Sequence, residues 1–324
     1  MNVIRLLSYF TLLSLIKHSL AYDGKTSHGS ACLGGMTSLN QCSCPISEGV
    51  LAILNTSRQV AAPTSLTFAH SSSIDPPRSS AEASIAKRGF AYNDASLVDS
   101  FTESVRCTKC SWAYNWDSTD YGLLQPSLDF VPMLWSPAPQ HTERWPQNVE
   151  AMILSGSTHI LGFNECDRPD QCNLNAEAAA AAHVEFVNGY ANRHGVKIGS
   201  PAISNSAVAG QGLSWLRLWV QVCDSLPVRC KYDFCVAHWY GDSVESLLNY
   251  VSSVREICPD KPIWLTEFAV DHGSDEQHAV FITAVVPLLD AIDYLERYAY
   301  FMIREGRFVY GPTITPSGQA YAEA

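Results

Sequence analysis

Two glutamates stand at the ends of apolar segments that have the length of buried strands. Glu165 follows the run Ile160–Phe163 and Asn164, and Glu267 lies within the run Ile263–Phe268. A carboxylate in such a segment is costly to bury unless it is paired, so two of them in matching places indicate function rather than packing. Two facing carboxyl groups can supply a general acid and a base or nucleophile, which is the pair that glycosidic cleavage needs.

Aromatic, amide and imidazole side chains stand near the ends of several such segments. Aromatic faces can stack on sugar rings, while amides and imidazoles can hold sugar hydroxyl groups through hydrogen bonds. We therefore expect a carbohydrate-binding mouth that includes Asn164, His238, Trp239, Tyr240, Trp135, Asn115, Trp116 and Tyr300. The alternative for His238 and for the tryptophans is a structural place in the core.

The elements that must position these residues alternate between short apolar runs and helical patterns from Arg88 onward. Eight runs are candidate strands: Gly89–Tyr92, Trp112–Tyr114, Phe130–Leu134, Ile160–Phe163, Val196–Ile198, Phe234–His238, Ile263–Phe268 and Arg297–Met302. Strands that alternate with helices predict a parallel sheet, and eight such units predict an α/β fold of the (β/α)8 TIM barrel type. The fourth and seventh strands, which carry Glu165 and Glu267, would then face each other across the carboxyl-end mouth.

An open, doubly wound sheet is the alternative fold. Such a sheet usually has a glycine-rich phosphate loop after its first strand, and residues 92–96 contain no glycine. Helix signals support the alternating pattern: an alanine-rich segment over Ala176–Arg193, with Gly195 at its end, and a capping box of Ser274 and Gln277. Pro287 lies inside the second helical pattern and is expected to kink it.

Three motifs taken together resemble the fungal β-1,3-glucanases of glycoside hydrolase family 128, the alkali-sensitive-linkage type of glycosyl hydrolase catalytic core. They are Leu161-Gly-Phe-Asn-Glu165 followed by Asp167, His238-Trp-Tyr240, and Trp264-Leu-Thr-Glu-Phe-Ala269. The resemblance extends from Arg88 to Gly318 and implies a retaining enzyme, which we expect to act as an endo-β-1,3-glucanase. It also implies that Glu165 is the acid/base, that Glu267 is the nucleophile, and that Asn164 binds the sugar 2-hydroxyl.

One position departs from that family's pattern. Many members have proline after the acid/base glutamate, whereas this chain has Cys166, with Cys172 six residues later. We interpret the two cysteines as a loop disulfide that replaces a rigid turn.

The chain is expected to divide into three parts: a secretory signal peptide over 1–21, a cysteine-containing extension with a serine- and proline-rich linker over 22–87, and a catalytic domain over 88–324. The signal pattern consists of Arg5, the apolar run 6–16, and the small residues Ser19 and Ala21 at the positions that determine cleavage after Ala21. A membrane anchor is the alternative, but the run is shorter than the ~20 residues that span a bilayer. We therefore expect a secreted, cell-wall-associated glycoprotein, with a glycosylation sequon at 55–57.

The eleven cysteines suit an oxidising compartment, where most should form disulfides. Because the number is odd, at least one is left free or pairs with another chain. We expect local bridges for Cys107 with Cys110 and for Cys223 with Cys230, since no second CxxC motif accompanies the first as a metal site would require.

The formal net charge of −11 disfavours nucleic acid and anionic membranes as partners, and a neutral β-glucan polysaccharide meets no such barrier. A serine hydrolase would need a Gly-x-Ser-x-Gly motif, and a metallohydrolase would need clustered ligands, whereas the ten histidines are scattered. No cofactor or metal is therefore expected, and the protein is expected to be a monomer. The alternative function is a non-catalytic, carbohydrate-binding wall protein on a glycosidase barrel, which would typically have lost one glutamate.

Overall fold

The computed structural model describes residues 86–324, so the predicted signal peptide, most of the extension, the cysteines at 32, 42 and 44 and the sequon lie outside this range. The strands are β1 (Arg88–Tyr92), β2 (Cys110–Tyr114), β3 (Asp129–Phe130), β4 (His159–Ile160), β5 (Lys197–Ile203), β6 (Phe234–Gly241), β7 (Ile263–Val270), β8 (Leu295–Glu305), β9 (Phe308–Tyr310) and β10 (Thr313–Ile314). The helices are α1 (Ala95–Ser104), α2 (Pro139–Thr142), α3 (Trp145–Leu154), α4 (Ala176–Phe186), α5 (Gly212–Ser225), α6 (Val244–Ile257), α7 (Asp275–Asp290) and α8 (Pro316–Glu323), with 3-10 turns at Asn188–Tyr190 and Arg193–Gly195.

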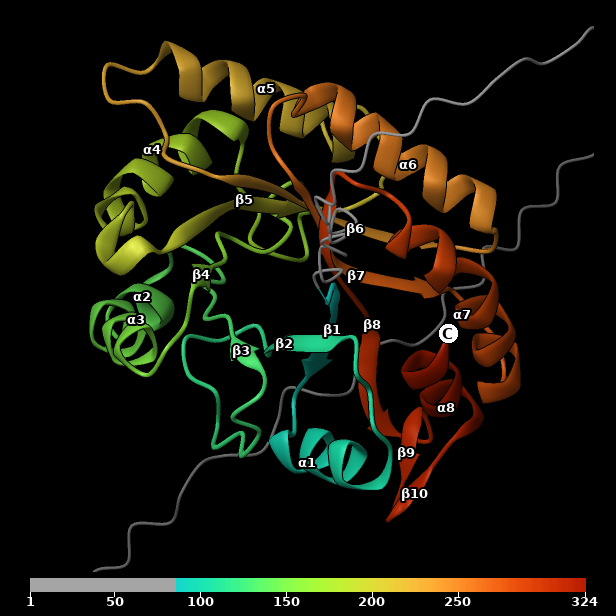
Figure 1. Cartoon of the computed structure of the whole chain (residues 1–324). Helices are drawn as coiled ribbons and strands as arrows, with labels where there is room; N and C mark the ends of the chain where they lie inside the picture. The colour runs from blue at the N-terminus through green and yellow to red at the C-terminus, as the bar shows by residue number, and fades with distance from the viewer. Residues whose placement is uncertain (1–85) are drawn as a thin grey trace, which may run out of the picture. The chain divides into compact units, whose positions relative to one another are not determined.

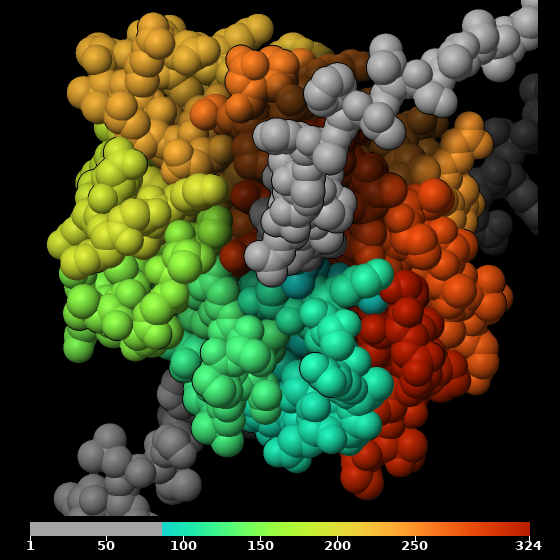
Figure 2. Space-filling view, in the orientation of Figure 1, coloured from blue at the N-terminus to red at the C-terminus, as the bar shows by residue number. Residues whose placement is uncertain are grey.

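Strands β1 to β8 form one parallel sheet in the order β3-β2-β1-β8-β7-β6-β5-β4, while β9 and β10 form a small hairpin beside β8. The two ends of this order also meet, because Met133 after β3 and Leu161 after β4 form a parallel bridge. Helices lie outside the strands, and successive parts of the chain follow one another around the molecule (Figures 1 and 2). This arrangement is consistent with a (β/α)8 barrel. Each of the eight predicted strands overlaps an observed one, although β3 and β4 share only one residue each with the predicted ranges.

Two hydrophobic clusters show which strand side chains point inward. The inner cluster consists of residues on strands or at their ends, including Trp112, Phe234 and Trp264. The larger outer cluster joins the strands to the helices, for example through Leu265 of β7 and Val285 of α7. Because side chains alternate along a strand, neighbouring residues normally belong to different clusters.

One of the eight predicted strand–helix units lacks its helix. Residues 115–128 between β2 and β3 are all described, and they contain turns and bends only. Helix α4 is also shorter than the predicted Ala176–Arg193 segment, because the chain continues as two 3-10 turns that end at Gly195. The capping box of Ser274 and Gln277 is confirmed at the start of α7, and Pro287 lies inside that helix.

Four disulfides occur within residues 86–324. The predicted bridges Cys107–Cys110, Cys166–Cys172 and Cys223–Cys230 are confirmed, and Cys235 of β6 pairs with Cys258 at the end of α6. None of the helices in this part of the chain is both long and apolar enough to cross a membrane.

Candidate active site

Glu165 lies where the chain turns away from the sheet after β4. The N–H of Asn164 donates to the carbonyl of Trp135 at 2.9 Å on one side, and the N–H of Glu165 donates to that of Ala202 at 2.9 Å on the other. Glu165 itself has φ +45°, in the left-handed region that residues with side chains seldom adopt. The bonds to both neighbouring segments hold this turn, which ends the regular alternation of the strand.

A bulge in β7 places Glu267 on the inner face. Ala237 of β6 pairs with Leu265, but His238 pairs with Glu267, so Thr266 is an additional residue in β7. Thr266 Oγ1 lies 2.9 Å from His238 Nε2, and Glu267 Oε1 lies 3.4 Å from His238 Nδ1. Two consecutive residues of β7 therefore contact the same imidazole, which a regular strand would not allow.

The His238 imidazole lies between the two carboxylates. Its Nδ1 atom is 2.8 Å from Glu165 Oε1, and the side chain is fully buried. One oxygen of each glutamate and one nitrogen of His238 all lie within 4.8 Å of one another. The two glutamates are 8% and 6% exposed, so they form a close and nearly dry carboxyl pair.

Fixed donors orient Glu267. The indole N–H of Trp116 donates to Oε1 at 2.8 Å, and the Tyr240 hydroxyl donates to Oε2. Burial and the charge of Glu267 raise the pKa of Tyr240 far above its usual value, so the phenol keeps its proton and donates. Because an indole N–H can only donate, both bonds favour the ionised form of Glu267.

The charges at the site are coupled. Burial raises the pKa of Glu267, His238 lowers it and Glu165 raises it again, and the net pKa lies above its usual value. Burial lowers the pKa of His238, but the charges of Glu267 and Glu165 outweigh it and raise that pKa. Glu267 and His238 therefore influence each other's protonation, and the negative charge of Glu165 makes it harder for Glu267 to lose its proton.

Among residues 86–324, Glu165, His238 and Glu267 also form a group that could offer ligands to a metal ion. However, His238 Nδ1 faces carboxylate oxygens at 2.8 and 3.4 Å, which is where its proton is bound. A metal would have to displace that proton and the two donors on Glu267. The hydrogen-bonding pattern therefore suits proton transfer better than metal binding.

The structure brings six of the predicted residues together: Glu165, Glu267, Asn164, His238, Tyr240 and Trp116. Asn115 lies behind them, because its amide donates to the carbonyl of Thr119 and accepts from the N–H of Asp117, which fixes the β2–β3 loop. Trp135 is partly exposed beside the inner cluster, with its ring 5.4 Å from that of His141. Its contact with a sugar stays a prediction.

Two of the predicted substrate contacts, Trp239 and Tyr300, are buried and face the helices. Trp239 is 2% exposed and points outward, where its ring stacks on Phe281 of α7 at 5.9 Å. Tyr300 is 1% exposed and also points outward, with its hydroxyl 2.6 Å from His278 Nδ1. The physical reason is alternation, since residues next to an inward-facing position face the helices.

Residues that the sequence did not indicate complete the site. Phe301, and not its neighbour Tyr300, lies at the site, where its ring contacts those of Trp116 and Tyr240 at 5.7 and 5.5 Å. Arg168 Nε lies 3.7 Å from Glu165 Oε2, and Gln171 accepts from Asn164. Strand alternation could have selected Phe301, whereas the two loop residues carry no periodic signal.

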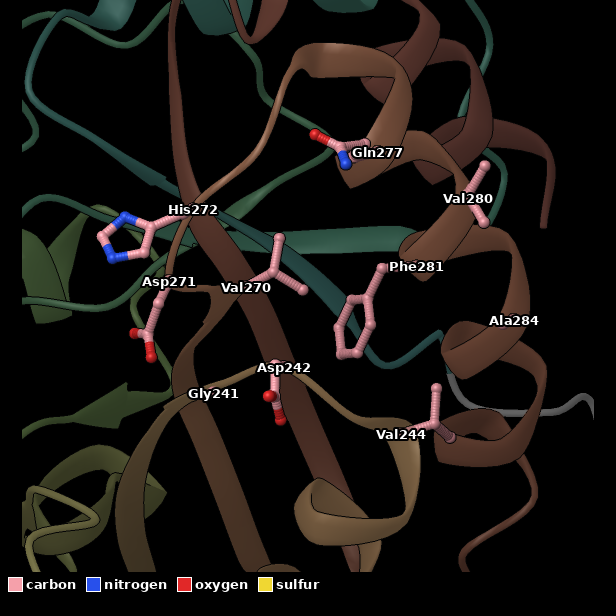
Figure 3. A pocket seen from close by; sticks show the side chains of 10 residues that line it. All are labelled: Gly241, Asp242, Val244, Val270, Asp271, His272, Gln277, Val280, Phe281 and Ala284. Atoms are coloured by element: carbon pink, nitrogen blue, oxygen red, sulfur yellow. The ribbon is translucent and has the colours of Figure 1, made fainter. Parts of the chain in front are cut away.

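A cavity of ≈510 Å³ is lined by other residues than the two glutamates. It is formed where β6 and β7 end and α7 begins, by residues such as Asp242, Asp271, His272 and Phe281 (Figure 3). Phe281 reaches from α7 toward the strands (Figure 3), and its ring stacks on that of Trp239. The carboxyl pair is not among its lining residues, so this cavity is distinct from the carboxyl site.

Comparisons with known proteins identify the family of the chain. The family model described as "Glycosyl hydrolase catalytic core" matches residues 89–321. Alkali-sensitive linkage protein 1 of Schizosaccharomyces pombe is 30% identical over 226 residues, which are 66% of this chain and 38% of that protein. The chain thus spans well under half the length of this relative.

Two solved structures extend the comparison. A family 128 (subgroup III) curdlan-specific exo-β-1,3-glucanase from Blastomyces gilchristii, in complex with glucose, is 36% identical with a TM-score of 0.66, and the match covers 74% of this chain and 98% of that one. A family 128 (subgroup II) endo-β-1,3-glucanase from Sorangium cellulosum is 27% identical with a TM-score of 0.60, covering 74% and 98%.

Proposed function

Because the chain belongs to the glycosyl hydrolase catalytic core family, within glycoside hydrolase family 128, we propose that it hydrolyses β-1,3-glucan with Glu165 and Glu267. The observation that carries the proposal is the buried carboxyl pair, joined by His238 and oriented by fixed donors. The β-1,3-glucanases that are 36% and 27% identical support the substrate class. We take the scaffold to be a closed (β/α)8 barrel, which the bridge between Met133 and Leu161 supports.

The proposed mechanism retains the anomeric configuration. Carboxyl groups of retaining enzymes lie about 5–5.5 Å apart, and those of inverting enzymes about 6.5–9.5 Å apart. The approach of oxygens from Glu165 and Glu267 to within 4.8 Å supports the retaining class, since little room for a water lies between them.

The roles follow from the donors. We assign Glu267 as the nucleophile, because Trp116 and Tyr240 donate to it and favour its ionised form, and Glu165 as the acid/base. Glu165 then gives a proton to the leaving glycosidic oxygen while Glu267 forms a bond to the anomeric carbon. Glu165 next takes a proton from water, and the water oxygen displaces Glu267.

Rescue by azide tests these roles. With an activated aryl β-glucoside, the Glu165→Ala enzyme should still form the glycosyl-enzyme, and azide should then yield the β-glycosyl azide. Glu267→Ala should be inactive alone and give the α-azide, because azide enters from the vacated side. Glu256→Ala, on the exposed face of α6, is the matched control and should behave like wild type. Reversed anomers would exchange the two roles, and identical anomers would refute the mechanism.

The product profile from linear β-1,3-glucan tests substrate and mode of attack. We keep endo action as a prediction, although the two relatives named above are described as exo and endo enzymes. Internal cleavage releases a ladder of oligosaccharides, whereas exo action releases a single short product from the outset. Faster cleavage of cellulose or chitin oligosaccharides would refute the substrate class, and an inactive wild type would favour the non-catalytic wall protein.

We also propose that the protein is secreted. The apolar N-terminal run and the four disulfides of residues 86–324 support this, because disulfides persist in oxidising compartments. Mass spectrometry of the protein from culture medium should find an N-terminus at Tyr22, and retention of the chain inside cells would contradict the proposal.

A further inference from the structure

The loop that follows Glu165 is closed by a disulfide and returns to the site. Cys166 and Cys172 are bridged, and the N–H of Cys172 donates to the carbonyl of Asn164 at 3.3 Å. A second backbone bond joins the N–H of Leu174 to the carbonyl of Cys166 at 2.9 Å. The residue before the bridged Cys172 is therefore held close to the start of the loop.

That residue is Gln171, and it contacts Asn164. The Asn164 amide nitrogen donates to Gln171 Oε1 at 3.2 Å. Asn164 is only 4% exposed, and among residues 86–324 its amide oxygen has no hydrogen-bond partner. A buried polar atom without a partner is costly, and such atoms in native proteins commonly await a ligand.

We propose that Gln171, held by the Cys166–Cys172 disulfide, is a positioning residue that fixes the Asn164 amide for a hydroxyl group of the reacting sugar. The bond to Gln171 uses one amide proton and sets the plane of the amide, which leaves the second proton and the oxygen for the ligand. A sugar hydroxyl both donates and accepts, so it can pair with either. This inference rests on the proposed function, because it requires a sugar beside Glu165.

The Cys166–Cys172 disulfide holds Gln171 in its contact with Asn164. Cys166 and Cys172 are six residues apart, so their bridge limits the conformations open to Gln171. Among residues 86–324, Gln171 is the side chain that forms a hydrogen bond with the Asn164 amide. Opening the bridge should therefore free Gln171 and weaken the same contact. Hydrogen bonds to the 2-hydroxyl strengthen in the transition state of glycosidases, so the loss should appear in the rate of glycosylation.

The test compares an activated aryl β-glucoside with its 2-deoxy counterpart. Gln171→Met keeps the size of the side chain but removes the acceptor, and it should lower kcat/KM on the parent substrate roughly three- to tenfold, the range of one neutral hydrogen bond. On the 2-deoxy substrate the same variant should match wild type, because the hydroxyl that Asn164 would hold is missing. An equal loss on both substrates would show a merely structural role and overturn the proposal.

The disulfide is tested in the same assay. Cys166→Ser with Cys172→Ser should reproduce the loss on the parent substrate, and adding Gln171→Met should lower the rate no further. Cys107→Ser with Cys110→Ser removes another short bridge, between α1 and β2, and should leave both substrates unaffected. Additive losses would separate Gln171 from the disulfide and refute that part.

Failure of the proposed function gives a different result. If wild type cleaves other β-glycosides but not β-1,3-glucosides, the substrate class is wrong, and the 2-deoxy comparison on the accepted glycoside still decides the role of Gln171. If wild type cleaves no glycoside, both proposals are refuted.

Discussion

Tyr240→Phe removes one donor from Glu267 and leaves the ring in place. The hydroxyl of Tyr240 donates to Glu267 Oε2, while Trp116 holds the other oxygen at 2.8 Å. This bond lowers the pKa of Glu267 against the burial that raises it. Its loss should therefore move an already raised pKa further upward.

The size of the shift follows from the type of bond. A hydrogen bond to a charged group contributes about 1.5–3 kcal/mol. One pKa unit corresponds to 1.36 kcal/mol, so loss of this bond should raise the pKa of Glu267 by roughly 1–2 units. Because Glu267 must be ionised to attack the anomeric carbon, activity appears as pH rises through this pKa. The acidic limb of kcat/KM should accordingly move to higher pH by about the same amount.

The assay is kcat/KM on an activated aryl β-glucoside across the acidic range. Tyr250→Phe is the matched control, since Tyr250 is a partly buried tyrosine of α6 whose hydroxyl donates to the carbonyl of Ser204 at 3.1 Å. Its acidic limb should coincide with that of wild type. An unmoved limb in Tyr240→Phe, or a shift to lower pH, would refute the electrostatic role that we assign to this bond.

Three further predictions concern stability. The pKa of Glu267 is raised on folding, so above about pH 4.5 the folded state binds more protons than the unfolded state, and stability falls as pH rises through the folded pKa. Glu267→Gln should therefore raise Tm relative to wild type at pH 7 but not at pH 4. An equal difference in Tm at the two pH values would contradict this. Trp239→Phe should lower the free energy of unfolding by about 1–2 kcal/mol and leave KM unchanged, because this ring packs against α7. A raised KM on laminarin would instead show that Trp239 contacts the substrate. A fragment of residues 86–324 should fold and be active, whereas a fragment of residues 88–324 should melt several degrees lower. The reason is that Lys87 Nζ donates to two carbonyls near the end of α7 at 3.0 and 2.7 Å. Equal Tm values of the two fragments by calorimetry would contradict this role of Lys87.

Signals that are local or continuous along the chain could be read from the sequence. The eight strands are apolar runs, and the capping box of α7 depends on two residues three positions apart. The bridges of Cys107, Cys166 and Cys223 each close a loop of a few residues. The bridge of Cys235 could not be predicted in this way, since its partner lies beyond a whole helix.

The missing helix after β2 illustrates a second limit. Residues 115–128 carry no helical period, but a repeating strand–helix pattern in the rest of the chain suggested a helix here as well. In the structure, side-chain bonds such as that from Asn115 to Thr119 hold this segment as a compact loop. The loop positions Trp116 so that its indole N–H donates to Glu267. The missing helix after β2 therefore leaves room for a loop that contributes to the site.

The orientation of strand residues marks the third limit, and β7 shows why. If β6 and β7 paired without interruption beyond Ala237 and Leu265, Thr266 would lie opposite His238 and Glu267 opposite Trp239. Glu267 would then share the outward direction of Trp239 and face α7 instead of Glu165. The extra residue in β7 prevents this, because a bulge adds one residue to one strand and redirects the next side chain. A bulge leaves no mark in an apolar run, so the sequence identifies Glu267 as a catalytic candidate while only the pairing of the strands explains how it reaches the inner face.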